Sequence, residues 1–226
     1  MALTAAHLGY DVLVHAREPA DADETIAAVR AQGRAAAIAA GDLADPATPH
    51  SLIAAAPAPL SLLVNCASVF ADDRLATLSA ASLDAAHAVN VRAPILLCQA
   101  FAAQAAAGSS IVNILDQRVL RLDPRYFSYS VSRTALWGAT RMLAQALAPA
   151  IRVNAIGPGP TLPSVHQSPA AFAAEATQSL LGQAVDADDI GAALRYLVDA
   201  RAVTGQLIAV DAGQHLNWRT PDVTDG

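Results

Sequence analysis

The sequence predicts an α/β protein whose parallel sheet is covered by helices on both faces. Apolar runs of strand length alternate with helical patterns along the whole chain, which is the order expected of a parallel sheet. The runs are almost continuously apolar, as strands buried on both faces are. With 226 residues, 54% of them hydrophobic, and no internal repeat, we expect a single domain over 1–226.

The first half of the chain predicts three strands and two helices before a long central helix. Branched residues indicate a strand over 10–17, and a helix over 22–33 closes on Gly33. A short strand lies within 34–43 and ends at Asp42, and a proline stops the helix expected over 48–57. Residues 60–68 form a buried strand.

The second half continues the alternation and ends on a strand. A long helix is expected over 82–108, a strand over 109–116 and a second long helix over 126–149. A strand over 151–159 runs into a Pro/Gly turn. The helix over 186–199 has an acidic first turn, which suits its dipole, and 205–213 is the last strand. The loop 160–185, mostly small and apolar, is expected to cover the substrate.

Charge and composition exclude several classes of function. The net charge of −6 and the pI near 5.4 argue against a nucleic-acid-binding surface. No apolar run reaches the roughly 18 residues of a membrane span, and the opening residues lack the pattern of a secretion signal. We therefore expect a cytoplasmic protein with Cys66 and Cys98 as buried free thiols. The six histidines form no ligand cluster, so no metal site is predicted.

Polar or conformationally special residues stand at the ends of five predicted strands. They are Arg17, Asp42, Asn65, Asp116 and Pro158. In a parallel α/β sheet, ligands bind beyond the carboxyl ends of the strands. The five residues therefore indicate a ligand site at one edge of the sheet.

Several motifs, in order along the chain, resemble those of the short-chain dehydrogenase/reductase family. They are Asp42-Leu43, Asn65-Cys66-Ala67-Ser68, Asn90 in "AVNV", Tyr129 with Arg133, Ile151 to Gly159, and Gly205-Gln with Val210 to Gly213. The resemblance implies a Rossmann-like, doubly wound sheet with three α/β/α layers. It looks closest to the pteridine and dihydropterin reductases, because Asp116 stands where the family usually has a catalytic serine.

The resemblance implies that Asn90, Asp116, Tyr129 and Arg133 carry the catalysis. Tyr129 would be the general acid, and a cation one helical turn away would lower the pKa of its phenol. The family uses lysine there, whereas this chain has no lysine, and arginine keeps the charge but not the shape. Asp116 would be a second proton donor or would orient a nitrogen heterocycle, and its pKa is raised if it is poorly solvated. Asn90 would hold a helix open and anchor a relay water.

Each assignment has a simpler alternative. Tyr129 and Arg133 are surface groups in that case, Asp116 caps a helix or a turn, and Asn90 is a buried amide bonded to the backbone. Arg17, which follows the second strand of the family fold, would accommodate the 2′-phosphate of NADP. Its alternative is a solvated loop arginine, and the adjacent Glu18 weakens the assignment.

The cofactor expected from the resemblance is NADP (NADPH), favoured over NAD. The expected cofactor-binding residues are Arg17, Asp42, Leu43, Asn65, Ala67, Tyr129, Arg133, Pro158, Gly159 and Thr161. The partners implied are a small-molecule substrate, with no nucleic acid or membrane, and further copies of the chain in a homodimer or homotetramer.

The first strand and the glycine-rich turn of the family fold are missing from the sequence. The opening residues, "MALTAAHLGYD", resemble the last turns of the helix that follows that turn. We expect a break at the centre of the sheet with two unpaired strand edges, and a true start upstream of Met1. The alternative function is a catalytically impaired homologue that acts as a scaffold or binding subunit.

Overall fold

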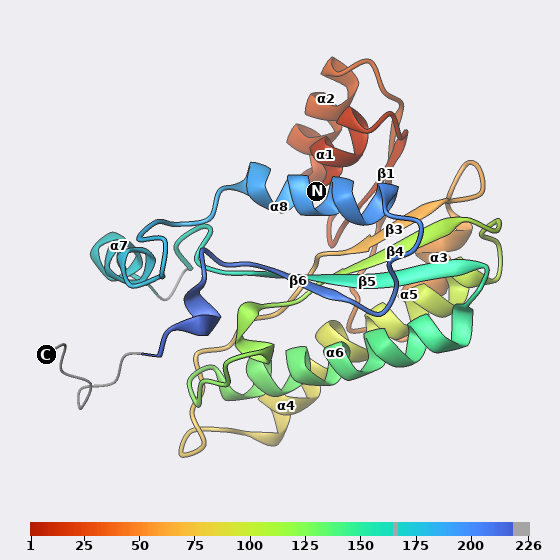
Figure 1. Ribbon diagram of the computed structural model, residues 1–226. Coiled ribbons are helices and arrows are strands. Elements are labelled where there is room, and N and C mark those ends of the chain that lie inside the picture. The colour runs from red at the N-terminus through yellow and green to blue at the C-terminus, as the bar shows by residue number, and fades with distance from the viewer. Residues whose placement is uncertain (165–166, 219–226) are drawn as a thin grey trace, which may run out of the picture.

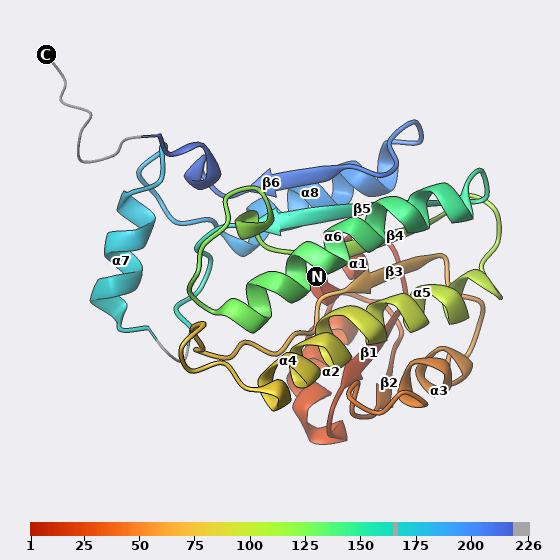
Figure 2. The same cartoon turned by 90° about the horizontal axis from the view of Figure 1, so that it is seen from below.

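The computed structural model describes residues 1–164 and 167–218, which form parallel strands between two layers of helices (Figure 1). The strands are β1 (Val12–Ala16), β2 (Ala36–Ala40), β3 (Leu62–Asn65), β4 (Ser109–Ile114), β5 (Ile151–Pro158) and β6 (Leu207–Val210). One face carries α1 (Ala2–His7), α2 (Asp23–Ala31) and α8 (Ala187–Asp199). The other carries α3 (Thr48–Ala54), α4 (Ala80–His87), α5 (Ala93–Ala102) and α6 (Phe127–Leu147) (Figure 2). The predicted three-layer α/β/α architecture is confirmed.

The strands form two sheets rather than one. β1 pairs with β2, the other four pair in the order β3-β4-β5-β6, and every pair is parallel. Among the described strands, β1 and β3 therefore each have one hydrogen-bonded neighbour, and the two-stranded sheet lies on the β3 side of the larger one (Figure 2). The break expected from the sequence is present between β1 and β3.

The core lies on both faces of the four-stranded sheet because side chains of β4 alternate between them. Val112 and Ile114 pack against α8, whereas Ile111 packs in a second cluster with Phe101 of α5 and Ala144 of α6. Most side chains in these clusters are fully or almost fully buried. The period-two alternation of a strand thus lets one sheet pack against both helical layers.

Two predicted elements differ from those observed. The helix expected over 82–108 is interrupted by a π-helical turn, Ala88–Arg92, between α4 and α5, and it ends at Ala102. The expected loop 160–185 contains helix α7 (Pro169–Thr177), which begins where the Ser168 hydroxyl accepts a hydrogen bond from Ala171 N. Single-turn π segments are frequent at functional sites, and this one carries Asn90.

Two features near the carboxyl end of the chain bear on stability. Arg152 on β5 fixes the end of α8, since its guanidinium donates to the carbonyls of Leu197 (2.7 Å), Val198 (2.8 Å), Ala200 (3.1 Å) and Val203 (3.3 Å). Ala212, in the turn after β6, has φ +51°, a left-handed conformation that favours glycine. The Cβ of alanine is unfavourable in this conformation, so Ala212 introduces local backbone strain.

Within the described ranges, no helix combines the length and the hydropathy that a bilayer crossing demands. The same residues contain no group of three or more His, Cys, Asp or Glu side chains arranged to hold a metal ion. Cys98 is buried as expected, but the prediction for Cys66 is wrong, because its side chain is exposed in the segment after β3.

Candidate active site

A cavity of about 300 Å³ lies beyond the carboxyl ends of β4 and β5. Helix α7 lies beyond the same edge of the sheet (Figure 2). Five residues predicted for the site line it: Asp116, Tyr129, Pro158, Gly159 and Thr161. They come from the segment after β4, the start of α6 and the turn after β5. Chain topology therefore brings together residues more than forty positions apart in sequence, at the edge where ligands of parallel sheets bind.

Tyr129 and Asp116 form a hydrogen-bonded pair in this cavity. The Tyr129 hydroxyl donates to Asp116 Oδ2 at 3.0 Å. The other carboxylate oxygen, Oδ1, accepts the backbone N–H of Arg118 at 2.8 Å and so caps a short 3₁₀ turn, Gln117–Val119. The turn-cap alternative and the site hypothesis for Asp116 are therefore compatible, because each uses a different oxygen atom.

Arg133 lies one helical turn beyond Tyr129 and is also buried. Tyr129 is 6% exposed and Arg133 is 3% exposed, so the alternative that both are surface groups is wrong. The guanidinium carbon lies 5.1 Å from the centroid of the Tyr129 ring. At this distance the cation interacts with the phenol through space, by its charge.

Burial of Tyr129 and the nearby Asp116 carboxylate raise the pKa of its phenol to about 12, although Arg133 acts in the opposite direction. The sequence predicted a lowered pKa from the Arg133 charge alone. The contribution of Arg133 has the expected sign, but desolvation is larger. The net direction is thus a correction: Tyr129 is a strongly held proton donor rather than a group poised to ionise.

Asn90 is fully buried in the π-helical turn and is anchored to the backbone. Its Oδ1 accepts from Val69 N at 2.9 Å, and its Nδ2 donates to Val69 O and to Ser132 Oγ, both at 3.0 Å. Asn90 therefore ties the segment after β3 to helix α6. This confirms the backbone-bonded alternative, while the relay water stays a prediction.

Four of the predicted cofactor-binding residues, from the segments after β1, β2 and β3, lie outside the cavity. Arg17 is exposed just after β1, and Asp42 is exposed with its carboxylate accepting from Ala44 N at 2.8 Å. Ala67 is exposed in the segment after β3. The Leu43 side chain packs in the core, so only its backbone is available to a ligand. These residues do not line the cavity, but each follows the carboxyl end of β1, β2 or β3, at the edge of the fold where the cavity lies.

Two buried polar atoms fit a nicotinamide nucleotide at this edge, and the packing of Gly159 shapes the turn beside it. The buried Nε of Arg133, beside the phenol, has no hydrogen-bond partner among the described residues, and neither has the buried Oδ1 of Asn65 at the end of β3. Buried polar atoms are normally paired, so both indicate a ligand. A Cβ on Gly159 would lie 2.7 Å from Cα of Asp211, which explains why the turn after β5 needs glycine there.

The structure adds cavity residues that the sequence argument missed: Phe70, Arg118, Arg125, Tyr126 and Glu175. The Tyr126 ring lies 4.4 Å from that of Phe70, between centroids, and its backbone is left-handed with φ +54°. Such conformations in bulky residues concentrate at functional sites. Glu175 had a signal in the sequence, because it is the only charged residue within 160–185.

Comparison with known proteins agrees with this geometry. Residues 1–215 match the family described as enoyl-(acyl carrier protein) reductase. The chain belongs to the short-chain dehydrogenase/reductase family. It is 33% identical over 245 residues to an uncharacterized oxidoreductase of Mycobacterium tuberculosis, an alignment covering 99% of this chain and 90% of that one. The predicted fold and enzyme class, an NAD(P)-dependent short-chain oxidoreductase, are thereby confirmed.

Two other similarities concern pterin chemistry. The chain superposes on the crystal structure of FolM alternative dihydrofolate reductase 1 from Brucella canis complexed with NADP, with a TM-score of 0.93, 39% identity, and coverage of 99% of this chain and 92% of that one. It is 34% identical over 132 residues to dihydromonapterin reductase of Klebsiella pneumoniae, covering 57% of this chain and 55% of that one. The resemblance to pteridine reductases is confirmed, and NADP is the cofactor in the Brucella structure.

Proposed function

We propose that this chain is an NADP-dependent reductase that transfers a hydride to a small carbonyl or pterin-like C=N substrate, with Tyr129 as general acid. A dihydropterin is the substrate we favour. The observation that carries the proposal is the hydrogen bond from the Tyr129 hydroxyl to Asp116 inside the cavity. The named relatives, a dihydromonapterin reductase and an alternative dihydrofolate reductase, support the same substrate class.

Bound NADPH would supply the hydride, which reduces the carbon of the C=N bond. The nitrogen then gains negative charge and needs a proton, which the Tyr129 hydroxyl donates. Asp116 holds that hydroxyl in place and offers a carboxylate to an N–H of the heterocycle. Arg133 stabilises the phenolate that forms, and the aromatic side chains of Phe70 and Tyr126 supply flat surface for the ring.

The residues proposed to hold NADP lie along the carboxyl edge of the sheet. Arg133 and Asn65 have buried polar atoms without partners in the described part of the chain, Thr161 and Gly159 belong to the turn after β5, and Arg17 carries positive charge for the 2′-phosphate. Tyr129 and Pro158 in the cavity, and Asp42, Leu43 and Ala67 through backbone or surface contacts, complete the predicted set.

The test is a steady-state assay of NADPH oxidation with dihydropterins, a quinone and a ketone, together with NADPH and NADH titrations by calorimetry. We expect turnover with a dihydropterin, tighter binding of NADPH, and a loss of about 10²–10⁴-fold in kcat for Tyr129→Phe. NADPH binding should survive this substitution. Failure of the purified protein to oxidise NADPH with any of these substrates would refute the proposal.

A non-catalytic scaffold or binding subunit is the second candidate, favoured by the break between β1 and β3 and by arginine at the family's lysine position. The two candidates differ in one result. NADPH turnover that disappears in Tyr129→Phe would exclude the scaffold, whereas NADPH binding without turnover would support it.

A further inference from the structure

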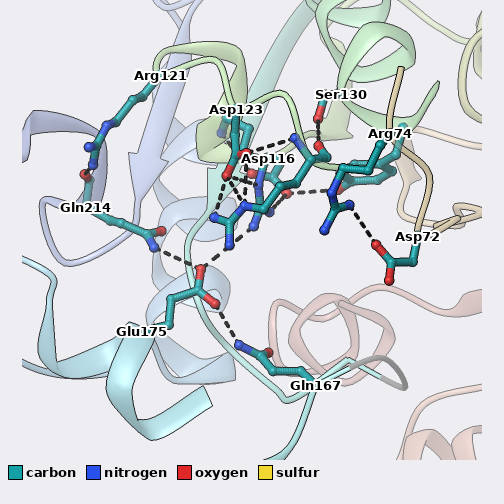
Figure 3. Close-up of polar contacts among 12 residues, drawn as sticks. Asp72, Arg74, Asp116, Arg121, Asp123, Ser130, Gln167, Glu175 and Gln214 are labelled. Atoms are coloured by element: carbon teal, nitrogen blue, oxygen red, sulfur yellow. Dashed lines mark hydrogen bonds and ion pairs between the residues drawn. The ribbon is translucent and has the colours of Figure 1, made fainter. Parts of the chain in front are cut away.

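The outer wall of the cavity carries a fixed carboxylate, that of Glu175 on helix α7. Its Oε2 accepts from Gln167 Nε2 at 2.8 Å and its Oε1 accepts from Gln214 Nε2 at 3.0 Å, and Figure 3 shows Glu175 between these two amides. All three residues line the cavity, and the Glu175 side chain is 28% exposed. Neutral amides orient the carboxylate, and the guanidinium of Arg118, 3.7 Å from Oε1, offsets its charge only in part because that guanidinium lies closer to Asp116.

The arginines of the cavity are already paired with carboxylates. Arg118 lies 3.1 Å from Asp116, 3.7 Å from Glu175 and 4.0 Å from Asp123. Burial opposes the charge of Arg118, yet these carboxylates outweigh it and raise its pKa. Arg125 forms a forked pair with both oxygens of Asp123, with contacts of 2.5–3.0 Å.

Carboxylates equal guanidinium groups among the cavity-lining residues and outnumber them in the ion-pair network. Asp116 and Glu175 line the cavity with Arg118 and Arg125, and Asp123, which lies outside the lining, pairs with both arginines. Among the described residues that line the cavity, no further cation is present. An incoming anionic group would therefore have to compete with an existing carboxylate for each arginine, and it would meet the Glu175 charge directly.

We propose that Glu175 is a specificity-determining residue that selects against substrates whose side chain carries a carboxylate, and favours a neutral, hydroxylated one. The proposal rests on the proposed function, in which the reacting ring lies at Tyr129 and Asp116. The cavity extends from that pair to α7, so the substrate's side chain lies near Glu175. Hydroxyl groups can donate to its carboxylate and bond both amides of Gln167 and Gln214, whereas a carboxylate can only accept.

The test is calorimetry with two ligands that differ only in charge, folate and its neutral diamide, in the presence of NADP⁺. We compare the wild type with Glu175→Gln, and use Glu24→Gln, an exposed position on α2, as the matched control. Removing the like charge should tighten folate binding about tenfold and change diamide binding by less than about threefold. Raised salt should weaken the discrimination in the wild type but not in Glu175→Gln, and Glu24→Gln should behave as the wild type.

The possible results separate this inference from the proposed function. Equal changes for both ligands in Glu175→Gln would overturn charge selection and assign Glu175 a purely structural role. Charge-dependent binding with no NADPH-dependent reduction of any dihydropterin would overturn the proposed function and leave the selection standing. Failure of the wild type to bind either ligand would overturn both.

Discussion

Replacing Arg133 with methionine tests how much of the chemistry depends on the buried cation. The substitution removes the charge and keeps a side chain of similar apolar length. The guanidinium carbon lies 5.1 Å from the Tyr129 ring centroid. At an effective dielectric constant of about 20, a unit charge at that separation stabilises a full phenolate by roughly 3 kcal/mol.

Roughly 3 kcal/mol corresponds to about two pKa units and, with full charge development in the transition state, to about 10²-fold in rate. We therefore expect Arg133→Met to lower kcat by up to about 10²-fold. Arg133→Lys should retain most of the activity, because it keeps the charge. In the oxidation direction, where the phenolate acts as base, Arg133→Met should lower the rate at every pH below the Tyr129 pKa, because losing the cation raises that pKa further.

The assay is NADPH oxidation at saturating substrate, measured beside a matched control on the same helix. Arg141 also lies over an aromatic ring, that of Trp137 at 5.9 Å, but it is exposed and outside the cavity. Arg141→Met should therefore leave kcat unchanged. If Arg133→Met turned over within about threefold of the wild type with the same pH profile, the electrostatic role of Arg133 would be refuted.

The remaining predictions concern stability. Arg152→Met removes the guanidinium from four carbonyls at and just beyond the end of α8. The Leu197 and Val198 carbonyls lose its bonds, whereas Ala200 O keeps Val203 N and Val203 O keeps Asn154 Nδ2. The change should cost about 2–3 kcal/mol in the free energy of unfolding and lower Tm by about 4–12 °C. Urea denaturation and calorimetry would measure it, and an unchanged midpoint would contradict it. Ala212→Gly relieves the left-handed strain and should stabilise the fold by about 0.5–1 kcal/mol, whereas Ala27→Gly, at an exposed position within α2, should destabilise it by about 1 kcal/mol. The Tyr129 pKa, raised to about 12, lies above its unfolded value, so the folded state keeps a proton that the unfolded state loses; stability should fall as pH rises from about 10 toward 12. Alkaline unfolding curves should show a weaker pH dependence in Tyr129→Phe.

The sequence predicted the strands well because each is a short apolar run, and burial on both faces leaves little room for polar residues. β1 to β6 all lie within their expected ranges and stop one to three residues before the expected ends. The first part of the 82–108 helix shows the limit of this approach. A π-helical turn shifts hydrogen bonds by one residue but keeps the side-chain pattern helical, so neither composition nor periodicity signals it. The π-helical turn is stabilised by tertiary contacts, because Asn90 forms hydrogen bonds with the backbone of Val69 and with the Ser132 hydroxyl.

The site was predictable where a motif fixes residue type and spacing, and less so where burial decides the chemistry. Asp116, Tyr129 and Arg133 converge as their motifs imply. The direction of the Tyr129 pKa shift depends on how deeply the phenol is buried, which the sequence does not reveal. In the structure, desolvation outweighs the neighbouring charge of Arg133. Cys66 was misjudged for a similar reason: its apolar neighbours continue β3 in sequence, but the strand ends at Asn65 and the next residue is exposed.

Asp116 illustrates why structural and catalytic roles need not compete at one residue. Its Oδ1 caps the 3₁₀ turn after β4 and fixes the backbone, while its Oδ2 faces Tyr129 and also pairs with Arg118. A serine at this position could cap the turn with its single oxygen or face the phenol, but not both in the same geometry. The carboxylate supplies both contacts and a negative charge, at the cost of a raised phenol pKa. The negative charge of Asp116 is balanced by Arg118, and the same guanidinium lies 3.7 Å from Glu175 on α7. One arginine therefore connects the aspartate at the reacting end of the cavity to the residue proposed to select the substrate at the opposite end.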